Sequence, residues 1–98
     1  MMTYESKVKT QFVEELYDAV LKLETIEECS RFFEDLCTIK EIQSLSQRLK
    51  VAKLLNEHKT YIDIESITHA STATISRVNR CLEYGANGYK LILEKYEK

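Results

Sequence analysis

Apolar side chains recur along this chain with the spacing of α-helices. Between Thr3 and about Leu23 they return every three or four residues, which predicts one long amphipathic helix. The apolar stripe of this helix comprises Val8, Phe12, Val13, Leu16, Tyr17, Val20, Leu21 and Leu23. The stripe is broad and the helix is long for so small a domain, so we expect part of this surface to contact a second subunit.

Two Thr-x-x-Glu segments predict where the next two helices begin. In such a capping box the threonine hydroxyl accepts from the amide three residues on, and the carboxylate accepts from the amide of the threonine. Thr25 and Glu28 open a short second helix, and Thr38 and Glu41 open a third. The predicted inner faces are Cys29, Phe32, Phe33 and Leu36 on the second helix, and Ile42, Leu45, Leu49, Ala52 and Leu55 on the third.

The second half of the chain continues in shorter pieces. After a loop at residues 56–59, Ile64 and Ile67 give the segment 61–68 an inner face, and a strand is the competing interpretation because isoleucine is β-branched. A last helix over residues 89–96 follows a turn at 85–88. Its apolar residues are Leu91, Ile92 and Leu93.

Between these two segments, residues 64–78 have the pattern of helix, short turn, helix. Ala70 is small and apolar where the turn must pass beneath the core, and His69 is among the residues that tolerate positive φ. Ser71 or Thr72 can cap the second helix, which starts at Thr72 or Ala73 and runs to about Tyr84. Its inner stripe is Ile75, Val78 and Leu82, and Gly85 is expected to end it in the left-handed conformation.

Composition favours an all-α fold. The 98 residues contain no proline and two glycines, whereas the tight turns of an all-β chain depend on both. No apolar run approaches the ~18 residues of a membrane span, and no secretory signal opens the chain. We expect one domain over residues 1–98, with core and dimerisation helices over 1–58, a helix-turn-helix over 61–84 and a C-terminal helix over 87–98.

The second helix of the helix-turn-helix is suited to the major groove of DNA. Residues 1–45 carry five Lys/Arg and ten Asp/Glu, residues 46–98 carry nine and six, and Ser66–Leu82 contains Arg77 and Arg80 but no acid. Small leading residues let the backbone approach base edges, and either guanidinium can reach guanine. The residues expected to contact DNA are Ser71, Thr72, Ala73, Ser76, Arg77, Asn79 and Arg80.

The segment from Ser71 to Arg80, followed by Leu82 and Tyr84-Gly85, resembles the Trp repressor family, and most closely its YerC/YecD branch. The resemblance continues through residues 36–38 and 45–50 and covers the first helix loosely. It implies about six helices and an intertwined dimer with one helix-turn-helix on each side.

The resemblance also implies an effector pocket. Thr38, Arg48 and Arg77 match the positions that hold tryptophan in the tryptophan-responsive members. Val78 replaces a glycine beside the indole, and Cys81 replaces a serine that assists the amino group of the ligand. Because a β-branched side chain would fill space that the ring needs, the resemblance argues against tryptophan as the effector, and leaves an unknown small molecule as an alternative.

Other chemistry is weakly represented. The three cysteines are Cys29, Cys37 and Cys81. They lack Cys-x-x-Cys spacing, so we expect buried, reduced thiols in a cytoplasmic protein. His58 and His69 have no further ligands at zinc spacing, and the turn at 85–88 lacks the Lys-Ser/Thr of a phosphate loop. We therefore expect no metal, no cofactor and no enzymatic activity.

The sequence as a whole predicts a dimeric regulator of transcription that binds double-stranded DNA, most simply a repressor at a palindromic operator. The alternative is a protein-interaction module whose acidic N-terminal half docks a partner and whose helix-turn-helix is only structural.

Overall fold

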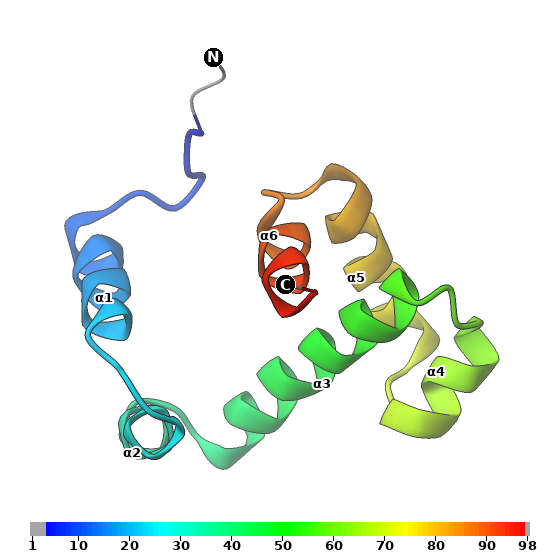
Figure 1. Ribbon diagram of the computed structural model, residues 1–98, viewed down its shortest axis with the longest axis horizontal. Coiled ribbons are helices and arrows are strands. Elements are labelled where there is room, and N and C mark those ends of the chain that lie inside the picture. The colour runs from blue at the N-terminus through cyan, green and yellow to red at the C-terminus, as the bar shows by residue number, and fades with distance from the viewer. Residues whose placement is uncertain (1–3, 98) are drawn as a thin grey trace. The chain divides into compact units, whose positions relative to one another are not determined.

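The computed structural model describes residues 4–97, and every helix or strand assigned among them is an α-helix (Figure 1). The helices are α1 (Gln11–Leu21), α2 (Ile26–Leu36), α3 (Ile39–Asn56), α4 (Tyr61–Thr68), α5 (Thr72–Tyr84) and α6 (Gly88–Tyr96). The all-α prediction is confirmed for these residues, and the strand alternative for α4 is wrong. The chain forms two compact units, Met1–Ile39 and Lys40–Lys98, so a single domain over residues 1–98 stays a prediction.

In the first unit, α1 is shorter than the periodicity predicts. The helix begins at Gln11, where the Thr10 hydroxyl oxygen accepts a hydrogen bond of 3.1 Å from the amide of Val13. Residues 4–10 are not helical, and the Ser6 hydroxyl accepts from the amide of Val8 at 3.1 Å. Such local hydroxyl–amide bonds compete with helix formation, which explains the later start; Thr3 lies outside the described residues.

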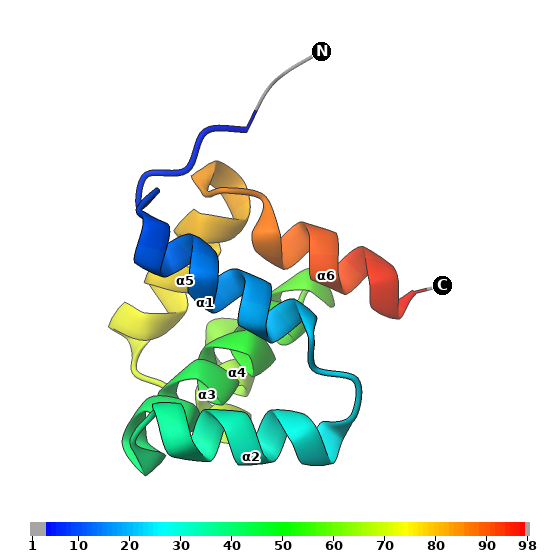
Figure 2. The same ribbon diagram turned by 90° about the vertical axis from the view of Figure 1, so that its left-hand side faces the viewer.

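The second helix begins where its capping box places it, with one difference. Thr25 Oγ1 accepts from the amide of Glu28 at 3.1 Å, but Glu28 Oε1 accepts at 2.8 Å from the amide of Glu24, one residue before the cap. Figure 2 shows α1 and α2 running in opposite directions. Phe32 and Phe33 meet edge to face, with ring centroids 5.5 Å apart. Neither α1 nor α2 contains a buried residue, so the first unit by itself does not bury their apolar faces.

The second unit contains the buried core. Its members come from the C-terminal half of α3, from α4, from the following turn and from α5: Val51, Ala52, Leu54, Ile64, Ala70, Ile75 and Val78. The predicted face of α3 is therefore only partly right, because Leu45 is 45% exposed while Val51 and Leu54 are buried. On α4, Ile64 is buried and Ile67 is 53% exposed, which corrects the predicted inner pair.

The last helix packs on this core, as Figure 1 shows for α5 and α6 above α3. Of the apolar residues of this helix, Leu93 is buried, whereas Leu91 and Ile92 are exposed, and Tyr89 packs on the core cluster. Lys53 Nζ of α3 lies 4.2 Å from the ring centroid of Tyr96, a cation–π contact between α3 and α6.

Gly85 ends α5, but not in the predicted conformation. Its φ of −85° and ψ of −158° are extended, and the left-handed residue of this turn is Asn87, with φ of 69°. A Cβ atom at Gly85 would collide with the carbonyl oxygen of Cys81. Glycine is therefore needed here for close approach of two backbone segments and not for positive φ.

Candidate nucleic-acid interface

Helices α4 and α5 are joined by a turn of three residues. His69 adopts the left-handed conformation, with φ of 60° and ψ of 17°, and its amide donates to the carbonyl of Glu65 at 2.8 Å. Ala70 is 2% exposed, packed beneath the turn as its size predicts. The helix-turn-helix expected for residues 64–78 is therefore present in the structure.

The turn is tied to α4 and to α3 through Thr68. The Thr68 hydroxyl donates to the carbonyl of Ile64 at 2.7 Å and accepts from the amide of Ala70 at 3.1 Å. The Thr68 carbonyl accepts a hydrogen bond of 3.1 Å from Gln47 Nε2 of α3. These bonds fix the end of α4 against the long helix, so α5 starts from a supported position.

Ser71 caps the first turn of α5, as the sequence predicts. Its Oγ accepts from the amide of Thr74 at 3.1 Å, and its hydroxyl lies 3.1 Å from Thr74 Oγ1. The amides of Thr72 and Ala73 precede the internal hydrogen bonds of the helix. An exposed helix N-terminus of this kind can donate to phosphate oxygens.

Buried and exposed side chains lie on different faces of α5, as expected. Ile75 and Val78 are at most 1% exposed, and Leu82 is half-buried. Six of the seven predicted contact residues are exposed, and Asn79 is half-buried. The exposed six are Ser71, Thr72, Ala73, Ser76, Arg77 and Arg80. The open face of α5 is thus built of small and hydroxyl side chains and two guanidinium groups.

Sequence reasoning missed one residue of this surface. Glu65, on the last turn of α4, places its Oε2 at 3.5 Å from Thr72 Oγ1. The acid-free segment begins at Ser66, immediately after it. Because the two residues are seven apart and meet only when the turn folds back, no periodic pattern could have paired them.

The residues expected to form an effector pocket lie on different elements. Arg48 is half-buried on α3, where its Nη1 donates to Ser44 Oγ at 3.0 Å, and Arg77 is exposed on α5. Thr38 precedes α3 and belongs to the first unit, so the grouping of these three residues stays a prediction. Val78, which replaces the glycine of the tryptophan-binding members, is part of the buried core.

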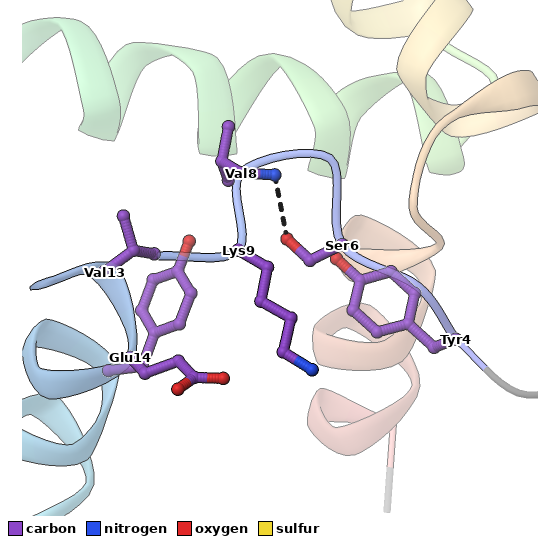
Figure 3. Close-up of a pocket in the computed structure, with 7 residues that line it drawn as sticks. Tyr4, Ser6, Val8, Lys9, Val13 and Glu14 are labelled. Atoms are coloured by element: carbon purple, nitrogen blue, oxygen red, sulfur yellow. Dashed lines mark hydrogen bonds between the residues drawn. The ribbon is translucent and has the colours of Figure 1, made fainter. Parts of the chain in front are cut away.

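A hollow in the first unit was not predicted. It encloses about 250 Å³ and is lined by residues of the N-terminal segment and α1 (Figure 3). Figure 3 shows Tyr4, Ser6 and Lys9 around it, with the Ser6–Val8 hydrogen bond on one side. Tyr4 is 70% exposed and Tyr17, which also lines the hollow, is 55% exposed, so it is open to solvent.

The three cysteines are less buried than the sequence predicts. The cysteines are free, but Cys29 and Cys81 are exposed and Cys37 is half-buried, so the prediction of buried thiols is wrong for the single chain. The reason is that α2 buries no residue and Cys81 lies on the exposed side of α5.

Within residues 4–97, no three His, Cys, Asp or Glu side chains are grouped to hold a metal ion. None of the described helices combines the length and apolar character of a membrane span.

Comparison with known proteins gives consistent matches. The family described as Trp repressor protein matches residues 11–97. The Bacillus subtilis protein YerC, described as uncharacterized, is 52% identical over 92 residues, covering 94% of this chain and 88% of that protein. A TrpR-like protein from Eubacterium eligens is 58% identical with a TM-score of 0.90, covering 93% of this chain and 94% of that one.

A candidate Trp repressor from Staphylococcus aureus is 53% identical with a TM-score of 0.88, and covers 91% of this chain and 89% of that one. The match to the family includes α1 through α6 and therefore the complete helix-turn-helix. The chain belongs to the Trp repressor family, a family of helix-turn-helix DNA-binding regulators and not of enzymes.

Proposed function

We propose that this protein is a sequence-specific transcriptional repressor that binds a palindromic DNA operator as a dimer. The observation that carries the proposal is the exposed face of α5, where Arg77 and Arg80 stand among small and hydroxyl side chains without a carboxylate on the same helix before Glu83. A face of this composition can enter the major groove, with guanidinium groups directed to guanine or phosphate.

Rigid support of α5 strengthens the proposal. Its inner side chains Ile75 and Val78 are buried in the core that also contains Ile64 of α4. Specific recognition requires base-reading side chains to be held in register, and a helix anchored by its opposite face meets that requirement. An occluded promoter would then be the simplest mechanism of repression.

Exposed apolar side chains in the first unit are the observation that supports a dimer. Phe12, Leu21 and Ile26 are between 81% and 89% exposed, although all three are large apolar side chains on or beside predicted inner faces. Leaving so many large apolar groups in water is unfavourable, and contiguous exposed apolar surface marks an interface. A second copy of the chain would cover these groups, and two-fold symmetry would place two α5 helices one turn of DNA, ~34 Å, apart.

The proposal includes no tryptophan effector. Burial of Val78 supports this, because its side chain is committed to the core and is not free to make room for a ring. Thr38, Arg48 and Arg77 remain the candidates for a different small molecule. Binding is tested by thermal shift against an amino-acid panel, where a raised midpoint identifies a ligand.

The test of the function is selection of bound duplexes from a random pool with the purified protein, followed by gel shift between 50 and 300 mM salt. We expect a two-fold symmetric motif and an affinity that falls steeply with salt, since Arg and Lys release counterions from phosphates. Absence of retained DNA at every salt concentration would favour the protein-interaction module instead. A cytoplasmic location follows from the proposed role, because the protein must reach the DNA.

A further inference from the structure

Glu65 places a carboxylate at the N-terminal end of α5, the helix that we assign to the major groove. Its Oε2 lies 3.5 Å from Oγ1 of Thr72, the first residue of α5. The amide of His69 closes the last turn of α4 by donating to the carbonyl of Glu65 at 2.8 Å, and the left-handed conformation of His69 ends the helix and turns the chain before α5. The carboxylate therefore belongs to the same surface as the first turn of α5.

This carboxylate is exposed and has an open surface in front of it. Glu65 and Thr72 line one surface hollow together with Ile62, Ser66 and His69. Glu65 and Thr72 are both exposed. Since Thr72 and Ala73 are at the blunt end of α5, a DNA base pair that approaches this end also approaches Glu65.

A carboxylate discriminates strongly between the groups that DNA presents. It repels phosphates and can only accept hydrogen bonds when ionised. In the major groove, guanine offers acceptors at N7 and O6 and thymine offers O4. Cytosine offers its N4 amino group, the usual partner of Asp and Glu, whereas adenine offers its N6 amino group beside the acceptor N7, an edge that suits the amide of Asn or Gln. A base that places an acceptor against Glu65 leaves the carboxylate desolvated and unpaired, which is costly.

We propose that Glu65 is a specificity-determining residue that selects cytosine at one position in each half-site, an inference that rests on the proposed function. The Thr72 hydroxyl, 3.5 Å from Glu65 Oε2, helps to hold the carboxylate at the end of α5 that would face the base edges. The negative charge also weakens binding to random duplex, where this end of α5 meets phosphates without the compensating amino group.

The test compares the wild-type protein with Glu65→Gln and with a matched control, Asp63→Asn. Both variants remove one negative charge from exposed positions of α4, but Asp63 lies in the first turn, away from the turn that joins α4 to α5. Duplexes are selected from a random pool with each protein. Affinities are then measured for the selected duplex and for its variants at each position.

We expect the wild type and Asp63→Asn to select the same motif, with one symmetric cytosine whose replacement lowers affinity about tenfold in a single half-site. In Glu65→Gln that preference is lost or shifts toward adenine, the base that Gln pairs with, and binding to random duplex rises severalfold. Glu65→Ala serves as a second variant and should lose the preference altogether. Circular dichroism and unfolding midpoints verify that the variants are folded.

The outcomes separate this inference from the proposed function. If the wild type selects a motif and the two Glu65 variants select the same motif with the same cytosine preference, the role of Glu65 is wrong and the repressor proposal stands. If the wild type retains no duplex at 50 mM salt, the proposed function fails and this inference fails with it.

Discussion

His69 occupies the turn between α4 and α5 with φ of 60°, a conformation that costs most residues free energy because Cβ approaches the backbone. Histidine is tolerated better than most there, which agrees with its prediction as a turn residue. The turn it forms decides where Ser71 caps α5 and where Glu65 meets Thr72. The conformation of His69 therefore contributes to the placement of the candidate interface, together with the hydrogen bonds of Thr68.

Replacing His69 by glycine should raise the free energy of unfolding by about 1 kcal/mol, because glycine adopts positive φ without the Cβ contact. His69→Val should lower it, since a β-branched side chain tolerates this region least. Urea unfolding of the three proteins measures both effects. A His69→Val protein as stable as the wild type would mean that the turn does not require the left-handed conformation.

Arg80 is the second residue whose replacement should have a measurable effect, in this case on DNA binding. If its guanidinium reads a base, Arg80→Ala should weaken binding to the selected operator by ~1–3 kcal/mol and relax the preference at one position. Equal weakening for selected and random duplex would reassign Arg80 to the phosphate backbone. Arg31→Ala is the control, because Arg31 lies on α2 and forms an exposed ion pair with Glu27.

At the scale of elements, each helix of the second unit has one face in the core and one in solvent. Ile64 is fully buried while Ile62, two residues earlier on the same helix, is 81% exposed. Local periodicity is enough to predict such a division for α5, whose inner stripe is confirmed. It was insufficient for α3, because only the C-terminal half of that helix contributes to the buried cluster.

Two of the three isoleucines of α4, Ile62 and Ile64, provide a matched pair. Ile64→Ala should lower the free energy of unfolding by about 2–5 kcal/mol, because it leaves a cavity among Val51, Ile75 and Val78. Ile62→Ala removes the same atoms from the surface and should change it by less than about 0.5 kcal/mol. Thermal or urea unfolding distinguishes them, and similar losses in both variants would contradict the described core.

The two glycines provide a second pair at the junction of α5 and α6. Gly85→Ala should destabilise the protein by about 1–3 kcal/mol, because the added Cβ would meet the backbone of Cys81. At Gly88 no atom lies within 4 Å of an added Cβ, so Gly88→Ala should be neutral or stabilising by up to about 1 kcal/mol. Equal effects on the unfolding midpoint would show that the end of α5 can relax.

On the scale of the whole molecule, the distribution of apolar and charged groups is uneven. Helices α1 and α2 bury no residue, whereas α3 to α6 contain all of the buried positions among those described except Ala70 in the turn. The acidic excess lies in residues 1–45 and the basic excess in residues 46–98. This distribution suits the proposed function, which assigns dimerisation to the first unit and DNA binding to the second.

A dimer held together by the first unit should unfold at a midpoint that rises with protein concentration, and should sediment with the mass of two chains. Phe12→Glu places a charge on an 85% exposed apolar position of α1 and should shift the protein toward single chains. Gln11→Glu introduces the same charge at the neighbouring exposed residue and should leave the dimer intact. A monomeric wild type at all concentrations would contradict the proposed assembly.

The sequence by itself determined which segments are helical and where most of them start, because caps and apolar spacing act over three or four residues. Thr25 and Ser71 cap their helices as predicted, and the outward face of α5 follows from the buried positions of Ile75 and Val78. The family resemblance was likewise carried by a continuous stretch of residues, and it is confirmed.

Only the tertiary structure decided features that depend on how distant segments approach one another. It determined which half of α3 is buried, why Gly85 must lack a side chain, and that Glu65 reaches Thr72 across the turn. Contacts of this kind depend on the angles of a turn and on the packing of two helices. Neither is encoded in the period of hydrophobic residues along a single helix.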